Sequence, residues 1–131
     1  MAWELELQPQ AREWRESLRG RERDHLEAAL SLLRQQGPGL GRPFVDSIKA
    51  SRHHNMKELR VGTSRALFAF DPRRCAVVLL AGDKQNDWRG WYQRNIPRAD
   101  RLYDQHLRGL GVGDRQWETR MRLSRVATRG R

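Results

Sequence analysis

The first apolar residues of the chain alternate with acidic ones. Trp3, Leu5 and Leu7 lie at every second position, with Glu4 and Glu6 between them. Successive side chains of a strand point to opposite faces, so this pattern is typical of a strand with one buried face. It predicts a short N-terminal strand.

Between residues 9 and 36 the apolar period lengthens to that of a helix. Two stripes with three- and four-residue spacing are separated at Gly20, which predicts a helix hairpin. The stripes are Ala11, Trp14 and Leu18, then Leu26, Ala29, Leu30 and Leu33. The following segment GPGLGRP, residues 37–43, has the composition of a loop.

Three apolar segments follow, separated by turn signals. They are MKELRV (56–61), SRALFAF (64–70) and CAVVLLAG (75–82), with Gly62-Thr63 in the first gap and DPRR (71–74) in the second. Asp followed by Pro suits the first two positions of a type I turn. We therefore expect an antiparallel meander.

A long amphipathic stripe comes next. Trp88, Trp91 and Tyr92 recur at helical spacing, and the stripe continues after Pro97 until the glycine-containing segment 109–111 ends it. Its later members are Ala99, Leu102, Tyr103, His106, Leu107 and Leu110. We expect the tryptophans to be core anchors rather than stacking surfaces, whereas Tyr92 could serve in both roles.

The residues after this helix differ in composition. They are rich in arginine and have few apolar anchors. We expect one folded domain over residues 1–110 and a basic tail over residues 111–131 that is flexible or ordered by a partner. The tail arginines could bind ribosomal RNA through their charge or simply be solvated.

Side-chain parity divides the meander into two faces if both connecting loops contain two residues. One face is apolar and is expected to lie under the N-terminal helices: Leu59, Val61, Ala66, Phe68, Phe70, Cys75, Val77 and Leu79. The other face is mixed, with its cations near one end: Met56, Glu58, Arg60, Arg65, Leu67, Val78, Leu80, Gly82 and Lys84. A one-residue slip would scatter these cations.

The same register places Arg60 directly opposite Arg65. Like charges in a cross-strand pair destabilise a sheet by up to roughly 1 kcal/mol. An anion between them, such as a bound phosphate, would remove this penalty. The pattern thus indicates a phosphate-binding site on the mixed face.

Composition supports an anionic partner. The formal net charge is +10 and the isoelectric point is about 11.2, values that attract phosphate backbones.

The single cysteine, Cys75, lies in an apolar run and cannot form an internal disulfide, which favours a reducing compartment. The chain shows neither a signal-peptide pattern nor an apolar run approaching about 18 residues. We therefore expect a cytoplasmic protein without membrane contact.

Three motifs occur in a fixed order: ELR at 58–60, R-x-L-F-x-F at 65–70 and L-L-x-G-x-K at 79–84. Together they resemble the RelE/ParE superfamily of bacterial toxins, most closely its HigB-like, phage Gp49-related branch. The resemblance runs from GRPFVDS at residue 41 to YDQHL at residue 107. It implies an α+β fold in which an N-terminal strand and a helix hairpin pack on an antiparallel sheet that is followed by a C-terminal helix.

The resemblance also implies a function. Members are toxins of type II toxin–antitoxin systems that cut mRNA, usually in the ribosomal A site, and a cognate antitoxin silences them. Here we expect a helix-turn-helix antitoxin, and no cofactor or metal. Such endoribonucleases use the RNA's own 2′-hydroxyl to attack the adjacent phosphorus, so the protein must align the reacting atoms and stabilise negative charge.

By this resemblance, four residues receive roles in catalysis or RNA binding. Arg65 matches the family's phosphate-binding arginine. Lys84 matches a basic residue that neutralises developing charge or protonates the leaving oxygen. Arg60 occupies a position that is commonly basic, and Tyr92 lies near a tyrosine that stacks on or orients the substrate.

The resemblance does not identify the general base as directly. The lysine pair of some relatives is reduced here to Lys57, with Glu58 beside it. His53 or His54 could supply a base because histidine titrates near neutral pH. Together with Lys57, both histidines are also candidate RNA-binding residues. The segment RHHN at 52–55 lacks a third metal ligand at recognisable spacing, so a polar loop is favoured over a metal site.

Two alternative functions stay open at this level. The basic face could belong to a non-catalytic RNA- or DNA-binding module. It could also belong to a ParE-like inhibitor of DNA gyrase, because that side of the superfamily shares the fold without the nuclease chemistry.

Overall fold

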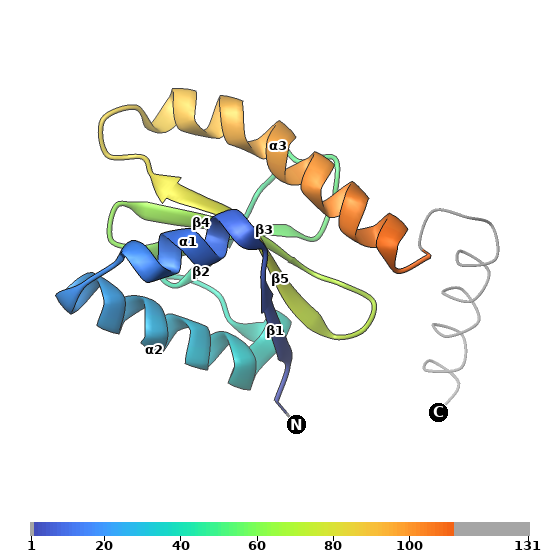
Figure 1. The fold of residues 1–131 in the computed structure, drawn as a ribbon, viewed down its shortest axis with the longest axis horizontal. Coiled ribbons are helices and arrows are strands. Elements are labelled where there is room, and N and C mark those ends of the chain that lie inside the picture. The colour runs from blue at the N-terminus through green and yellow to red at the C-terminus, as the bar shows by residue number, and fades with distance from the viewer. Residues whose placement is uncertain (1, 112–131) are drawn as a thin grey trace.

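The computed structural model describes residues 2–111, which form an α+β fold with a five-stranded sheet of order β1-β5-β4-β3-β2. Helices α1 and α2 cover one face of the sheet and α3 covers the other (Figure 1). The elements are β1 (Glu4–Leu7), α1 (Pro9–Ser17), α2 (Gly20–Gln36), the 3-10 helix η1 (Gly37–Gly39), β2 (Val45–Ser47), β3 (Met56–Val61), β4 (Ser64–Phe70), β5 (Cys75–Asp83) and α3 (Trp88–Gly109).

The order of elements confirms the predicted strand, helix hairpin, meander and C-terminal helix. Strand β1 is parallel to β5, and the other three strand pairs are antiparallel. The short edge strand β2 was not predicted. The expected tail falls almost entirely outside the described residues.

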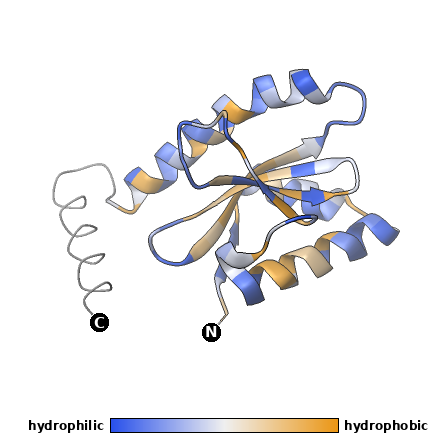
Figure 2. Ribbon diagram, turned by 180° about the vertical axis from the view of Figure 1, so that it is seen from behind, coloured by the Kyte–Doolittle hydropathy of each residue, from blue (hydrophilic) through white to orange (hydrophobic). Residues whose placement is uncertain are grey.

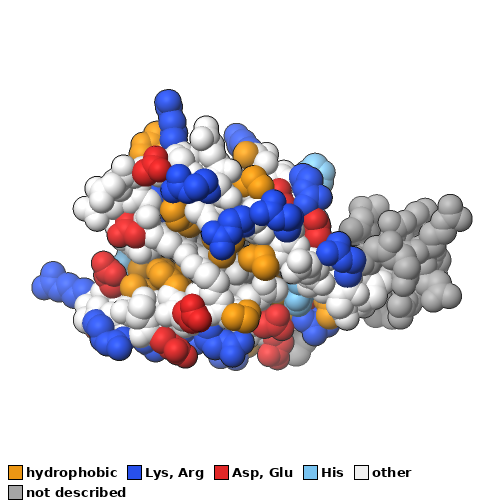
Figure 3. Space-filling model, turned by 45° about the horizontal axis from the view of Figure 1, so that its top comes forward, with side chains coloured by type: hydrophobic (Ala, Val, Ile, Leu, Met, Phe, Trp, Pro, Cys, Tyr) orange, Lys and Arg blue, Asp and Glu red, His pale blue; other side chains and the backbone are white. Residues whose placement is uncertain are grey.

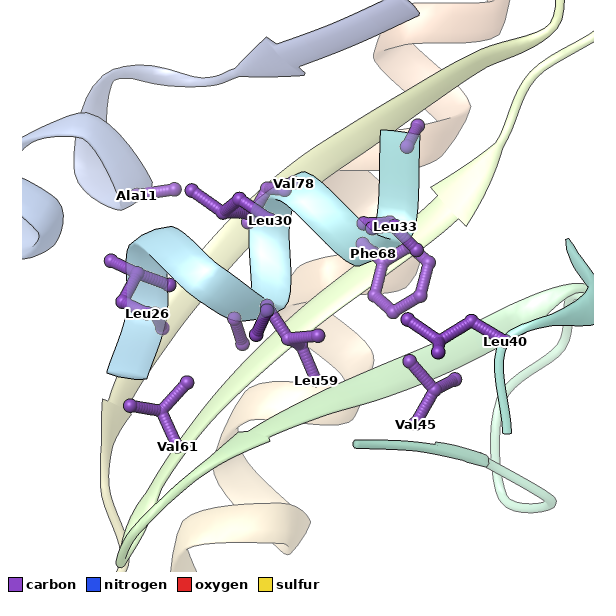
Figure 4. Packing of buried hydrophobic residues seen from close by; sticks show 14 of the residues in the cluster. Ala11, Leu26, Leu30, Leu33, Leu40, Val45, Leu59, Val61, Phe68 and Val78 are labelled. Atoms are coloured by element: carbon purple, nitrogen blue, oxygen red, sulfur yellow. The ribbon is translucent and has the colours of Figure 1, made fainter. Parts of the chain in front are cut away.

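Two apolar clusters lie on opposite faces of the sheet. In the first, Leu26, Leu30 and Leu33 of α2 pack against Leu59 and Phe68 of the sheet (Figure 4). In the second, Trp91, Ile96, Ala99 and Tyr103 of α3 pack against side chains from β3, β4 and β5. Figure 2 shows the matching division of the helices into a hydrophobic inner side and a hydrophilic outer side.

The predicted faces are right for β3 and β4 and wrong for the first half of β5. Cys75, Val77 and Leu79 pack on the α3 side, and Val78 packs on the α1–α2 side. One cause is the turn after β4, where Asp71 lies opposite Cys75, so that the three residues 72–74 separate the facing positions instead of the two assumed. Asp71 N donates to Cys75 O at 2.8 Å across this loop, which shifts the register by one residue.

A β-bulge then shifts the register a second time. Phe68 pairs with Val78 whereas Leu67 pairs with Leu80, so Leu79 is the additional residue. Two shifts of one residue restore the original parity. Leu80 and Gly82 therefore lie on the predicted mixed face, although Arg65 is opposite Gly82 rather than Leu80.

Helix α3 is fixed at its C-terminal end by Asp71, whose side chain is 0% exposed. His106 Nε2 lies 2.8 Å from one carboxylate oxygen, and Arg73 Nη2 donates to the same oxygen at 2.9 Å. The backbone N–H groups of Arg73 and Cys75 donate to the other oxygen. Burial raises the pKa of Asp71, but the hydrogen bonds from His106 and Arg73 outweigh it, so the pKa is lowered overall.

Cys75 is a buried free thiol, as predicted. Burial, with the nearby charges of Asp71 and Glu6, raises its pKa to about 11. The thiol is therefore protonated and unreactive at neutral pH.

Within residues 2–111, no helix combines the length and the apolar composition that crossing a membrane would require.

Candidate active site

Arg60 and Arg65 are cross-strand partners in the β3–β4 hairpin, as the sequence predicted. The hairpin closes through Gly62 and Thr63, between the paired residues Val61 and Ser64. Gly62 has a φ of 59°, in the left-handed region that glycine adopts without a steric penalty. This two-residue turn fixes the register that brings both arginines to the α3 side of the sheet.

The anion between the two arginines is Glu58, a carboxylate of the protein itself, whereas the sequence suggested a bound phosphate for this place. The Glu58 side chain is 5% exposed, and its Oε1 lies 3.2 Å from Arg60 Nε. Its Oε2 lies 4.0 Å from Arg65 Nε. Arg60 Nη2 also lies 3.1 Å from Asp46 Oδ2 on β2. Internal carboxylates therefore relieve the repulsion between the arginines.

Tyr92 joins the same cluster from α3. Its hydroxyl donates to Glu58 Oε2 at 2.6 Å. Burial, followed by the hydrogen bond to Glu58 and its negative charge, raises the pKa of Tyr92 to about 12. The phenol is therefore protonated near neutral pH, where it serves as a hydrogen-bond donor and not as a base.

Arg65 is held more firmly than Arg60. Its side chain is 13% exposed, compared with 35% for Arg60. Its Nη1 donates to Gly62 O at 2.7 Å and to Ser64 O at 2.8 Å, both in its own hairpin. Its Nε is buried and has no hydrogen-bond partner within residues 2–111. A buried donor without a partner is costly, so the described residues do not fully satisfy this guanidinium.

Gly82 sets how closely α3 approaches this cluster. It is the cross-strand partner of Arg65, and a Cβ atom at this position would lie 2.7 Å from Trp91 Nε1. The glycine therefore makes room for the indole of Trp91 against β5. This contact confirms the prediction that Trp91 is a core anchor.

Lys84 lies at the same end of the sheet as the arginine pair. It follows β5 directly, and its backbone N–H donates to Thr63 O in the hairpin turn at 3.1 Å. Figure 1 shows the β5–α3 connection beside the β3–β4 turn. The structure thus brings Arg60, Arg65 and Lys84 to one end of the sheet.

The other predicted RNA-binding residues lie elsewhere. Lys57 extends to the opposite face, where its Nζ is 3.5 Å from Pro38 O. His53 and His54 precede β3, at the end of the sheet away from the hairpin turn, and His53 Nε2 lies 2.8 Å from Asp104 Oδ1. The structure therefore does not place these residues with the arginine pair, and the proposed histidine base is not supported.

Sequence reasoning missed the part that Glu58 and Asp46 play. Glu58 was visible as an acidic residue between apolar positions of a buried strand, a pattern that indicates a charge with a fixed partner. Asp46 could not be placed because it lies on β2, the strand that was not predicted. Among residues 2–111, no group of three or more His, Cys, Asp or Glu side chains could hold a metal ion.

Exposed arginines also follow the outer side of α3, and Figure 3 shows basic side chains gathered over this side of the molecule. They are Arg89, Arg94, Arg98, Arg101 and Arg108. An array of this kind attracts polyanions over distances longer than a hydrogen bond. The site at the hairpin therefore lies beside a positively charged surface.

Known proteins share both the sequence and the fold. HigB3 of Mycobacterium tuberculosis, which is named as a toxin, is 50% identical over 103 residues, covering 77% of this chain and 90% of that protein. HigB2 of the same organism, also named as a toxin, is 46% identical over 98 residues, covering 69% of this chain and 49% of that protein.

A solved structure agrees with the fold. The archaeal RelE–RelB complex from Pyrococcus horikoshii OT3 contains a chain that superposes with a TM-score of 0.55 at 14% identity, covering 66% of this chain and 99% of that one. This likeness confirms the predicted RelE-like architecture. The family model of phage derived Gp49-like proteins matches residues 13–104. This protein therefore belongs to the Gp49-like family, which agrees with its identity to HigB toxins.

Proposed function

We propose that this protein is the toxin of a type II toxin–antitoxin pair and an endoribonuclease that cuts translated mRNA. The proposal is supported by 50% identity to HigB3 along 90% of that protein's length. Because the RelE chain of the archaeal structure is in complex with RelB, we also propose that an antitoxin binds this chain. Its expected helix-turn-helix class rests on family analogy alone.

The observation that carries the nuclease proposal is the arginine pair beside Lys84. Arg60 and Arg65 face each other, and they share the single buried carboxylate of Glu58. The surrounding ion pairs join Arg42, Arg60 and Arg65 to only two carboxylates, those of Asp46 and Glu58. This leaves an excess of one positive charge, and Lys84 adds another at the same end of the sheet. A phosphodiester carries one negative charge and gains another in the transition state.

In the proposed reaction, the 2′-hydroxyl loses its proton to solvent hydroxide while its oxygen forms a bond to phosphorus. The bond from phosphorus to the 5′-oxygen breaks, which leaves a 2′,3′-cyclic phosphate. The arginine pair holds the phosphoryl oxygens. Lys84 gives a proton to the departing 5′-oxygen. Glu58 and Tyr92 do not touch the RNA in this scheme; they position the two guanidinium groups. The contribution of the protein is thus mainly alignment and charge stabilisation.

The test is to express the protein in cells and map the 5′ ends of mRNA. The wild-type chain is expected to produce cuts within translated regions that are phased with codons, and a variant with Arg65→Ala and Lys84→Ala together is expected to lose them. Removing one such charge-stabilising group typically costs about 10²- to 10³-fold in rate. Arg12→Ala with Arg21→Ala, on the exposed surface of the helix hairpin, is the matched control for the lost charge.

Two results would count against this proposal. Unchanged cutting by the Arg65→Ala, Lys84→Ala variant would remove the assigned site. A DNA-damage response without RNA cuts would favour the gyrase-inhibitor alternative.

A further inference from the structure

Trp88 is unusual among the large apolar residues of this protein. Its side chain is 55% exposed, and it is the only exposed large hydrophobic residue in the part of the chain that the structure describes. The sequence-based expectation that Trp88 is a core anchor is therefore wrong. The reason is positional: Trp88 is the first residue of α3 and follows the end of β5 at Asp83, so no strand of the sheet extends beneath it.

The position of Trp88 is nevertheless well fixed. Asp87 caps α3 by accepting a hydrogen bond from Gly90 N at 3.2 Å. Trp91, three residues after Trp88, packs against Gly82 of β5. Asp87 N also donates to Lys84 O at 3.2 Å, which closes the connection from β5. The indole of Trp88 is thus exposed on a helix end that is anchored on both sides.

Trp88 lies one helical turn before Tyr92. Residues four apart are neighbours on a helix surface, separated by about 6 Å along the axis. Tyr92 in turn donates to Glu58, the carboxylate between Arg60 and Arg65. A phosphate held by the arginine pair would therefore have the indole within roughly one nucleotide of its position.

The surroundings of Trp88 favour a polyanionic occupant. The guanidinium of Arg89 lies 5.6 Å from the centroid of its ring, and Lys84 precedes it on the same connection. The nearest acids are already engaged: Asp87 accepts from Gly90 and Arg94, and Asp83 Oδ1 accepts from Gln85 N. An exposed indole beside cations is the combination with which proteins bind single-stranded nucleic acid.

We propose that Trp88 is a stacking platform for the unpaired RNA base next to the phosphate held by Arg60 and Arg65. This inference rests on the proposed function for the identity of the nucleic acid, and it adds a residue that positions substrate. The aromatic face supplies affinity for a flanking base without reading its hydrogen-bonding edge. Purines, which have the larger ring system, should bind this platform more tightly than pyrimidines.

The experiment uses single-stranded RNA nonamers in which every 2′-hydroxyl is methylated, so that the nucleophile of the proposed reaction is blocked. The dissociation constant of the wild-type chain is measured with the intact nonamer and with a set that carries one abasic nucleotide at each position in turn. The same set is measured with Trp88→Leu, which keeps an apolar side chain but cannot stack, and with Trp88→Phe, which can.

We expect one abasic position to weaken binding by the wild-type chain roughly 5- to 100-fold, because one stacked base contributes about 1 to 3 kcal/mol and 1.4 kcal/mol is a tenfold change. Trp88→Leu should weaken binding of the intact nonamer to a similar extent and should abolish the additional penalty at that position. Trp88→Phe should recover most of the affinity.

The inference is overturned if Trp88→Leu binds the intact nonamer within twofold of wild type. It is also overturned if the loss of affinity caused by Trp88→Leu and the loss caused by the abasic nucleotide multiply when both are combined, because independent contacts behave in this way. A Trp88→Leu variant that loses affinity for its antitoxin but not for RNA would also overturn it. Cleavage is measured separately on unmethylated RNA. If Trp88→Leu and the abasic position affect binding together as expected but unmethylated RNA is not cleaved, the proposed nuclease function is refuted and the stacking role of Trp88 stands.

Discussion

The two ends of α3 each contact a buried carboxylate, but the two carboxylates have different surroundings. At the C-terminal end, Asp71 receives hydrogen bonds from His106, from Arg73 and from two backbone N–H groups. At the N-terminal end, Glu58 is shared by two arginines and Tyr92. One cluster satisfies its charge internally, whereas the other has an excess of cations.

This difference separates a structural contact from a binding site. The cluster at Asp71 has no buried donor without a partner, within the described residues, whereas the cluster at Glu58 includes Arg65 Nε. Polar groups that are fully paired inside a protein contribute to its stability. At the Glu58 cluster the arginines Arg42, Arg60 and Arg65 outnumber the carboxylates Asp46 and Glu58, which favours an additional anion. The contrast yields four predictions, ordered by expected size.

The largest effect is expected for Asp71→Asn. The amide places an N–H donor where one carboxylate oxygen accepted two hydrogen bonds, and Arg73 keeps only the longer contact to Glu6 at 3.8 Å. Each donor left without its acceptor costs about 1 to 3 kcal/mol, so losing two acceptors costs about 4 kcal/mol of unfolding free energy. Urea unfolding measures this cost. RNA affinity of the folded fraction should be unchanged, and a selective loss of RNA affinity would contradict the distinction between the two clusters.

The second prediction concerns Tyr92 at alkaline pH. Its pKa in the folded protein, about 12, lies above the ordinary value of 10, so its protonated form stabilises the fold. That contribution is complete below pH 10 and disappears as the pH rises from 10 to 12. Two pKa units at 1.36 kcal/mol each correspond to about 2.7 kcal/mol. Wild-type protein and Tyr92→Phe are compared by urea unfolding at pH 9 and pH 11.5. The wild type should lose more stability, and equal losses would refute the prediction.

A smaller effect is expected for Gly82→Ala. The added Cβ would meet Trp91 Nε1 at 2.7 Å, so the first turn of α3 must move. Overpacking of this kind costs about 1 to 3 kcal/mol, and we expect the lower half of that range because a helix end can shift. Gly39→Ala is the matched control, since a Cβ there meets no atom within 4 Å. If both variants are equally stable in thermal unfolding, the close contact between α3 and β5 does not hold the site together.

The last prediction concerns RNA binding by Glu58→Gln, whose expected change is small. Its stability cost should resemble that of Asp71→Asn, because Glu58 is 5% exposed and its loss leaves Arg65, whose side chain is 13% exposed, without a carboxylate partner. RNA binding should become tighter at low salt, and the slope of log affinity against log salt should steepen by about 0.7, the value for one additional phosphate contact on a single strand. Weaker binding at low salt would indicate that Glu58 contacts the RNA itself.

The elements and the arginine pair could be predicted because their signals are local. The face on which each side chain of β3 and β4 lies depends only on the Gly62-Thr63 turn, and the sequence pattern predicts the length of this turn correctly. The parity of β5 depends on a loop with Arg74 at a φ of 65° and on a bulge, and neither has a distinctive sequence pattern. The correct placement of Gly82 on the mixed face therefore depended on two one-residue errors that cancelled.

Other features were missed because they depend on tertiary contacts. Glu58 could be placed on the correct face, but nothing local showed that Tyr92 would approach it from a helix 34 positions later. Trp88 and Trp91 share one helical stripe in the sequence, yet only Trp91 lies over the sheet. Where β5 ends decides this difference, and strand ends are poorly defined by apolar pattern alone.

The pairing of β1 with β5 has a consequence for synthesis of the protein. The side chain of Gln10, just after β1, exchanges two hydrogen bonds with the backbone of Ala81, 71 positions later. Contacts over so long a separation form late in folding, because a large loop must close first. A nascent chain can therefore assemble its helix hairpin early, but it completes the sheet that presents Arg65 only after β5 has left the ribosome.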